Sequence, residues 1–172
     1  MASFETERLR AERLRPEHGP LIHAMHLDPV QMATLGGVRT AEQTAEYMGR
    51  NLEHWARHGF GVWLLRERAS GAVAGRALLR HLELEGDGVV EVGYSVLAES
   101  WGQGLAPEIA AECLRLGRER LGLDSIVAVT LPDNFRSRRV MEKVGMTYQR
   151  EVEHAGLRHV MYRITFGAGA QA

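Results

Sequence analysis

The chain has 172 residues, of which 45% are hydrophobic and 25% charged, and its formal net charge is −1. This length suits one domain with a single core, and the near-neutral charge argues against a nucleic-acid or membrane-surface binder. The single cysteine, Cys113, excludes an internal disulfide and fits a cytoplasmic location, and no apolar run approaches the ~18 residues of a membrane span.

The first third of the chain predicts a strand followed by two helices. Residues 7–14 alternate in polarity, and Pro16 then opens a helix with Leu21, Ile22 and Met25 on one side. Thr40, with a glutamine three residues on, has the capping-box pattern of a second helix that Gly59 ends.

The middle of the chain predicts strands with one helix among them. Residues 60–66 and 72–84 read as antiparallel neighbours, and 89–97 as a further strand. A helix over 104–121 then leads to the continuous apolar run at 125–131, which is typical of a buried strand. Because that helix connects two strands as a crossover, the strands at 89–97 and 125–131 are predicted to be parallel.

The last third predicts a helix and a closing hairpin. Asp133 is the expected N-cap of a helix ending at Val144, and residues 148–154 and 159–166 read as two paired strands. The total is seven strands in a mixed, mostly antiparallel sheet with helices on both faces. The parallel fourth and fifth strands are expected to splay apart.

The domain prediction is one single domain over residues 1–166 with a flexible tail at 167–172. No metal site is expected, because the histidines are scattered. His23 and His26 read more simply as a pair on a helix surface than as zinc ligands.

One segment has the pattern of a phosphate-binding turn. A strand leads into Trp101-Gly102-Gln103-Gly104-Leu105-Ala106, and a helix follows. Amides at a helix N-terminus favour a phosphate, and glycines allow close approach to the backbone. The pattern lacks the Gly-Lys-Ser/Thr of a P-loop, and an ordinary tight turn is the alternative interpretation.

The surrounding motifs resemble the GNAT superfamily of N-acetyltransferases, in particular its RimJ/RimL-like branch. That branch shows Trp-Gly-x-Gly-Tyr/Leu-Ala-x-Glu, which residues 101–108 match. Residues 134–146 similarly resemble its Asn-x-x-Ser-x-Arg-Val-x-Glu-Lys-x-Gly-Phe/Met motif, and residues 6–12 resemble its first strand. The resemblance therefore covers nearly the whole chain and implies the GNAT fold.

The resemblance implies acetyl-CoA as co-substrate and assigns it a set of contacts. These are Ser95, Val96, Leu97, Trp101, Gly102, Gln103, Gly104, Leu105, Ala106, Asn134 and Ser137. It also implies an amine that attacks the thioester directly. No metal, nucleic acid or membrane is expected as a partner, and the protein is expected to be a monomer or homodimer.

Two residues are candidates for proton transfer. Glu91 lies on the strand that leads to the loop and is a candidate base for the amine, although it could equally pair with an arginine. Ser137 takes the place of the tyrosine that many superfamily members use to protonate the leaving thiolate. The alternative that an ordered water, and not Glu91, takes the proton from the amine stays open.

The acceptor stays open between a protein N-terminal α-amine and a small amine such as an amino acid, polyamine or antibiotic. A non-catalytic acyl-CoA-binding module is the alternative of another class. Retention of Glu91 and Ser137 argues against it.

Overall fold

The structure is a computed structural model that describes residues 3–167, and the chain divides into two compact units. The first unit comprises the residues up to Leu78 together with Tyr94–Ala106, and the second comprises Leu79–Gly93 and the residues from Pro107 onward. Residues 168–172 of the predicted tail lie outside the described residues, and the extent of the domain stays a prediction.

The strands form one mixed sheet of eight strands in the order β1-β2-β3-β4-β5-β6-β8-β7. Two of them, β4 (Val73–Leu84) and β5 (Asp87–Val96), pass from one unit into the other. The expected mixed, mostly antiparallel sheet is confirmed. The predicted number of seven strands was wrong, because an additional strand precedes the first predicted one.

That additional strand is β1 (Ser3–Glu5), which pairs antiparallel with β2 (Leu9–Arg13). Three residues are too few to show an alternating pattern, so only the turn could have indicated it. In this turn the Thr6 hydroxyl accepts a hydrogen bond from the Leu9 amide at 3.0 Å. β3 (Val62–Glu67) and β4 continue the antiparallel pairing.

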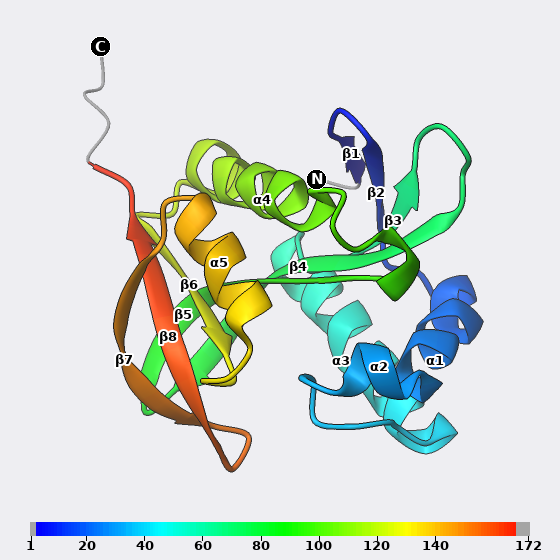
Figure 1. Cartoon of the computed structure of the whole chain (residues 1–172), viewed down its shortest axis with the longest axis horizontal. Coiled ribbons are helices and arrows are strands. Elements are labelled where there is room, and N and C mark those ends of the chain that lie inside the picture. The colour runs from blue at the N-terminus through cyan, green and yellow to red at the C-terminus, as the bar shows by residue number, and fades with distance from the viewer. Residues whose placement is uncertain (1–2, 168–172) are drawn as a thin grey trace. The chain divides into compact units, whose positions relative to one another are not determined.

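Three helices belong to the first unit: α1 (Gly19–Leu27), α2 (Pro29–Met32) and α3 (Ala41–His58) (Figure 1). A short 3₁₀ turn, Pro16–His18, precedes α1. The Thr40 cap of α3 is confirmed, since its hydroxyl accepts from the Gln43 amide at 3.2 Å.

The single-turn helix α2 was not predicted. Asp28 caps it by accepting hydrogen bonds from the amides of Val30 and Gln31. The histidine pair on α1 was also misjudged, because His26 is fully buried rather than on a helix surface.

The core of the first unit is built from large apolar side chains of α1, α3 and the strands. Trp55 and Trp63 meet edge to face with ring centroids 5.4 Å apart, and the Trp55 indole donates to the Val62 carbonyl at 2.8 Å. Buried aromatic side chains contribute much of a core's energy because each removes a large area from water.

The second unit holds β6 (Ser125–Thr130), β7 (Thr147–His154), β8 (Leu157–Thr165), α5 (Phe135–Lys143) and most of α4 (Leu105–Leu121) (Figure 1). β8 pairs antiparallel with both β6 and β7, so the predicted closing hairpin is confirmed. Its core includes four buried residues: Leu84, Val127, Val152 and Met161.

The parallel pair predicted from the crossover is also confirmed. β5 and β6 share one register position, Glu91 with Val127, although the strands have ten and six residues. A single paired position is what diverging strands give. No helix of the described residues is both long and apolar enough to cross a membrane.

Candidate functional site

The glycine turn adopts a conformation that requires glycine at two positions. After β5, a 3₁₀ turn at Ala98–Ser100 leads through Trp101 to Gly102, with φ +76°, and Gly104, with φ +79°. α4 begins immediately afterwards. A side chain at either glycine would be strained. The turn is therefore specified by its sequence and presents the free amides of a helix start.

Trp101 ties this turn to the end of β5. Its indole donates to the Val96 carbonyl at 2.8 Å, and 41% of its surface stays exposed. The Leu97 amide donates to the Ala74 carbonyl at 2.8 Å, so this amide is already engaged. The structure thus brings together the predicted contacts from Ser95 to Ala106 within the first unit.

Arg8 is a candidate residue that the sequence prediction missed. Its guanidinium donates to the Gln103 carbonyl at 2.5 Å, and Nη2 lies 3.4 Å from where a Cβ on Gly104 would stand. Arg8 belongs to the opening motif that carries the family resemblance, but no spacing links it to a turn 95 residues later. An exposed cation here favours an anionic ligand at the turn.

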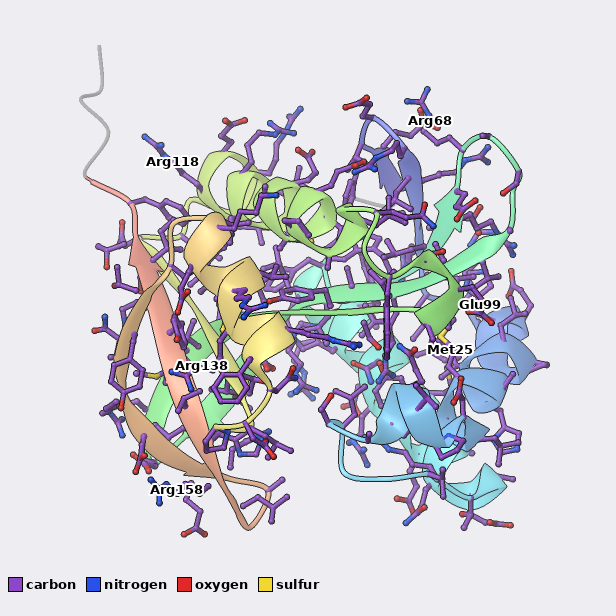
Figure 2. The ribbon with its side chains drawn as sticks, viewed as in Figure 1. Met25, Arg68, Glu99, Arg118, Arg138 and Arg158 are labelled. Atoms are coloured by element: carbon purple, nitrogen blue, oxygen red, sulfur yellow. The ribbon has the colours of Figure 1, made fainter. Side chains whose placement is uncertain are left out.

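Glu67 is connected to the glycine turn through Ser100, which directly precedes Trp101. One carboxylate oxygen accepts from the Ser100 hydroxyl at 3.2 Å, and the other accepts from the Ser70 hydroxyl at 3.0 Å. Ser100 is buried, whereas Ser70 lies in the exposed β3–β4 turn. The next residue, Arg68, donates to the carbonyls of Thr6 and Glu7 in the β1–β2 turn (Figure 2).

Glu91 lies in the second unit and is paired with an arginine. Its buried carboxylate accepts from Arg80 Nε at 2.8 Å. His154 is near this pair: burial lowers the pKa of His154 below its ordinary value, while Glu91 acts in the opposite direction. The arginine pairing is the structural interpretation that the sequence left open.

Asn134 and Ser137 lie at the start of α5. The Asn134 side chain accepts from the Ser137 amide at 3.2 Å and donates to Thr130 Oγ1 at 2.9 Å. Asn134, not Asp133, is therefore the N-cap, and the predicted cap was wrong by one residue. These two bonds hold Asn134 in place, and Ser137 is half-buried.

The basic residues of α5 are not equivalent. Arg138 extends towards β8 (Figure 2), where it donates to the Tyr162 hydroxyl at 3.2 Å, and it also donates to the Pro132 carbonyl at 2.8 Å. Tyr162 in turn donates to Glu142 at 3.0 Å. Arg138 thus fastens α5 to the sheet, while Arg136 and Arg139 lie exposed.

Fold and turn together define the class of protein. The family model described as Acetyltransferase (GNAT) domain matches residues 8–147, and the chain belongs to this family. The chain is therefore an acyl-CoA-dependent N-acetyltransferase that transfers an acetyl group to an amine.

Two similar proteins each match most of the chain. It is 28% identical over 148 residues to "Uncharacterized protein YkkB" of Bacillus subtilis, covering 86% of each chain. It is also 28% identical over 160 residues to "FsC-acetyl coenzyme A-N(2)-transacetylase" of Aspergillus fumigatus, covering 85% of this chain and 65% of that protein.

Solved structures share the fold. An acetyltransferase from Agrobacterium tumefaciens superposes with a TM-score of 0.85 at 22% identity, covering 96% of this chain and 95% of that one. RimL, described as a ribosomal L7/L12 alpha-N-protein acetyltransferase in complex with coenzyme A, has a TM-score of 0.76 at 19% identity, covering 93% and 95%. At these identities the two structures show the shared fold.

Proposed function

We propose that the protein transfers an acetyl group from acetyl-CoA to a primary α-amine, and that the pyrophosphate of acetyl-CoA binds the amides of residues 103–106. The observation that carries the proposal is the turn at Gly102 and Gly104, whose positive φ values lead directly into α4, where the first amides have no partner within the helix. Phosphates are favoured at such helix starts. Arg8, beside the turn, adds a positive charge.

The α-amine follows from the names of two relatives. RimL is described as an alpha-N-protein acetyltransferase, and the Aspergillus fumigatus relative as an N(2)-transacetylase. The first name specifies an α-amine, and the second specifies one numbered nitrogen of its substrate. A protein N-terminus and a free amino acid each carry such an amine.

In the reaction, one bond between heavy atoms forms, one breaks, and a proton is transferred at each end. The neutral amine attacks the thioester carbon, the C–N bond forms, and the C–S bond breaks to release the CoA thiolate. The amine loses a proton, and we assign its uptake to Glu91, directly or through one water. The thiolate gains a proton, and we assign its donation to the Ser137 hydroxyl.

The Ser95–Leu97 segment of β5 is the proposed support for the pantetheine arm and for the oxyanion of the intermediate. The Leu97 amide already donates to Ala74, so it is not available to the oxyanion. Asn134 is the proposed partner of a pantetheine amide through the second lone pair of its carbonyl oxygen.

The test of cofactor placement is Gly104→Asp, measured by isothermal titration with CoA. We expect binding to weaken about tenfold or more, because like charges ~4 Å apart repel by roughly 1–4 kcal/mol. Gly86→Asp, at another positive-φ turn with open space around it, is the matched control. Equal affinities of Gly104→Asp and the parent would refute the placement.

The test of the reaction is release of free thiol from acetyl-CoA with panels of peptides and small amines, confirmed by product mass. Ser137→Ala should lower kcat roughly 10- to 100-fold and leave CoA affinity unchanged, since a proton donor acts in the transition state. An unchanged kcat would dismiss the serine. CoA binding without acetylation of any amine would favour the non-catalytic binding module.

A further inference from the structure

Arg76 on β4 is a buried cation without a carboxylate partner. The residue is 7% exposed, and its Nη1 donates to His26 Nε2 at 2.9 Å. Within residues 3–167, no aspartate or glutamate forms an ion pair with it. Buried arginines are usually paired, because an unpaired charge away from water is costly.

His26 does not supply the missing negative charge. Its Nε2 accepts from Arg76, so its Nδ1 must carry the hydrogen and donate to Thr44 Oγ1 at 2.9 Å. Burial, followed by Arg76 and Arg39, lowers the pKa of His26 from 6.5 to about 3. His26 is therefore a neutral acceptor that orients the guanidinium and leaves its charge uncompensated.

A second cation lies at the same place. The Tyr47 ring contacts the Arg76 guanidinium carbon at 4.9 Å and the Arg39 guanidinium carbon at 5.3 Å from its centroid. An aromatic face stabilises a cation, but it does not neutralise one. Two guanidinium groups therefore lie against the same aromatic ring.

Two polar atoms in this region lack hydrogen bonds. Among the described residues, three buried side-chain polar atoms have no partner, and two of them are Gln31 Oε1 and the Tyr47 hydroxyl. The third, Trp63 Nε1, lies in the apolar core. Buried polar atoms are nearly always paired in native proteins, so the Tyr47 hydroxyl, on the ring that contacts Arg76, and the Gln31 oxygen are each open to a polar partner.

The region borders the end of β5. Gln31 Nε2 donates to the Ser95 hydroxyl, which fixes the Gln31 amide. Gly75 precedes Arg76, and a Cβ there would stand 2.1 Å from the Ser95 carbonyl oxygen. The cation and the orphan atoms therefore adjoin the strand segment to which the proposed function assigns the thioester.

We propose that Arg76, Arg39, Tyr47 and Gln31 bind an acceptor that carries a free carboxylate close to its amine, which makes it a small amino acid. The guanidinium of Arg76 binds the carboxylate, the Tyr47 hydroxyl donates to it, and Gln31 Oε1 accepts a hydrogen from the amine. Polyamines and aminoglycosides are disfavoured, since their charges repel both arginines. This inference rests on the proposed acetyl transfer.

The orphan atoms are sealed from solvent, so the acceptor needs a small displacement of the elements over them. The single turn α2 (Pro29–Met32) carries Gln31. It is the element we expect to shift when an amino acid enters.

The experiment compares acceptors that differ only in the carboxylate. Free amino acids, their carboxamides and the decarboxylated amines with the same side chain are assayed by thiol release, alongside spermidine and kanamycin. We expect kcat/KM for the best free acid to exceed that of its carboxamide at least about tenfold, as loss of a charge-assisted hydrogen bond predicts.

Variants test whether this cluster of Arg76, Arg39, Tyr47 and Gln31 produces the preference for a free carboxylate. Arg76→Gln should raise KM for the free acid about tenfold or more, with little change in KM for the carboxamide or in CoA affinity. Arg39→Gln, at a half-buried position that tolerates change more easily, should act in the same direction with a smaller effect. Arg13→Gln is the control, because Arg13 also stacks on an aromatic ring, that of Trp55, outside the cluster.

The outcomes separate the two proposals. Equal or better turnover of carboxamides, decarboxylated amines or spermidine would overturn the carboxylate site and leave acetyl transfer standing. Absence of CoA binding would overturn the proposed function itself. The carboxylate site is then tested by NMR titration of the free amino acids, and equal shifts in the parent and Arg76→Gln would overturn it.

Discussion

At Gly75 the backbone of β4 lies directly against that of β5, and Gly75→Ala should separate the two strands. The new Cβ would stand 2.1 Å from the Ser95 carbonyl oxygen and 2.9 Å from Val96 Cα, and both are backbone atoms that cannot turn aside. The φ of +142° adds strain for any residue with a side chain. Such strain costs about 1–3 kcal/mol, and overpacking about as much again.

The expected loss of stability is therefore about 2–6 kcal/mol, a large part of the roughly 5–15 kcal/mol that holds a domain together. At this chain length the melting temperature should fall by roughly 5–20 °C in a calorimetric scan. The affinity for CoA should fall as well, because the displaced residues are Ser95 and Val96.

Gly71→Ala is the matched control for this prediction. Gly71 also has positive φ, +73°, but a Cβ there would meet no atom within 4 Å. Only the left-handed conformation is then penalised, at about 1–2 kcal/mol. If Gly75→Ala melted at the same temperature as Gly71→Ala, the close approach of the two strands would be refuted.

Three further predictions concern other parts of the molecule. Asn134→Ala should remove the N-cap of α5 and lower the free energy of unfolding by about 1 kcal/mol, measured by urea unfolding. Arg8→Gln should weaken CoA binding severalfold at low salt, and titrations at rising salt should show the difference disappear, since exposed charges are screened. The pKa of His26 is about 3 when folded and 6.5 otherwise, so the unfolded chain binds a proton that the folded chain excludes. Stability should thus fall by roughly 2 kcal/mol from pH 7 to pH 5, and His26→Gln should remove that slope in pH-dependent denaturation.

Most of the fold was predictable because its signals are local. Thr40 with Gln43, the glycine after α3, and the apolar run of β6 each specify their element through nearby residues. The parallel pairing of β5 and β6 followed from one crossover helix. β1 and α2 were missed because each is too short to repeat a pattern.

The site was predictable only where residues are close in sequence. The turn from Trp101 to Gly104 carries its own signal, since its glycines serve its backbone. Arg8 and Arg76 have no such local signal, because their importance comes from residues that the fold brings near them. Arg8 meets the Gln103 carbonyl, and Arg76 meets a neutral histidine and no carboxylate. The proton-transfer roles of Glu91 and Ser137 stay predictions.

The Glu67 carboxylate joins two segments that a genetic screen would treat as unrelated. One of its oxygens holds Ser70 in an exposed hairpin turn, and the other holds Ser100 at the entrance to the glycine turn. A substitution that moves the Glu67 carboxylate towards the hairpin therefore weakens its hydrogen bond with Ser100. Ser70 variants should therefore emerge as suppressors or enhancers of defects in the glycine turn, and the effects of paired changes should depart from additivity.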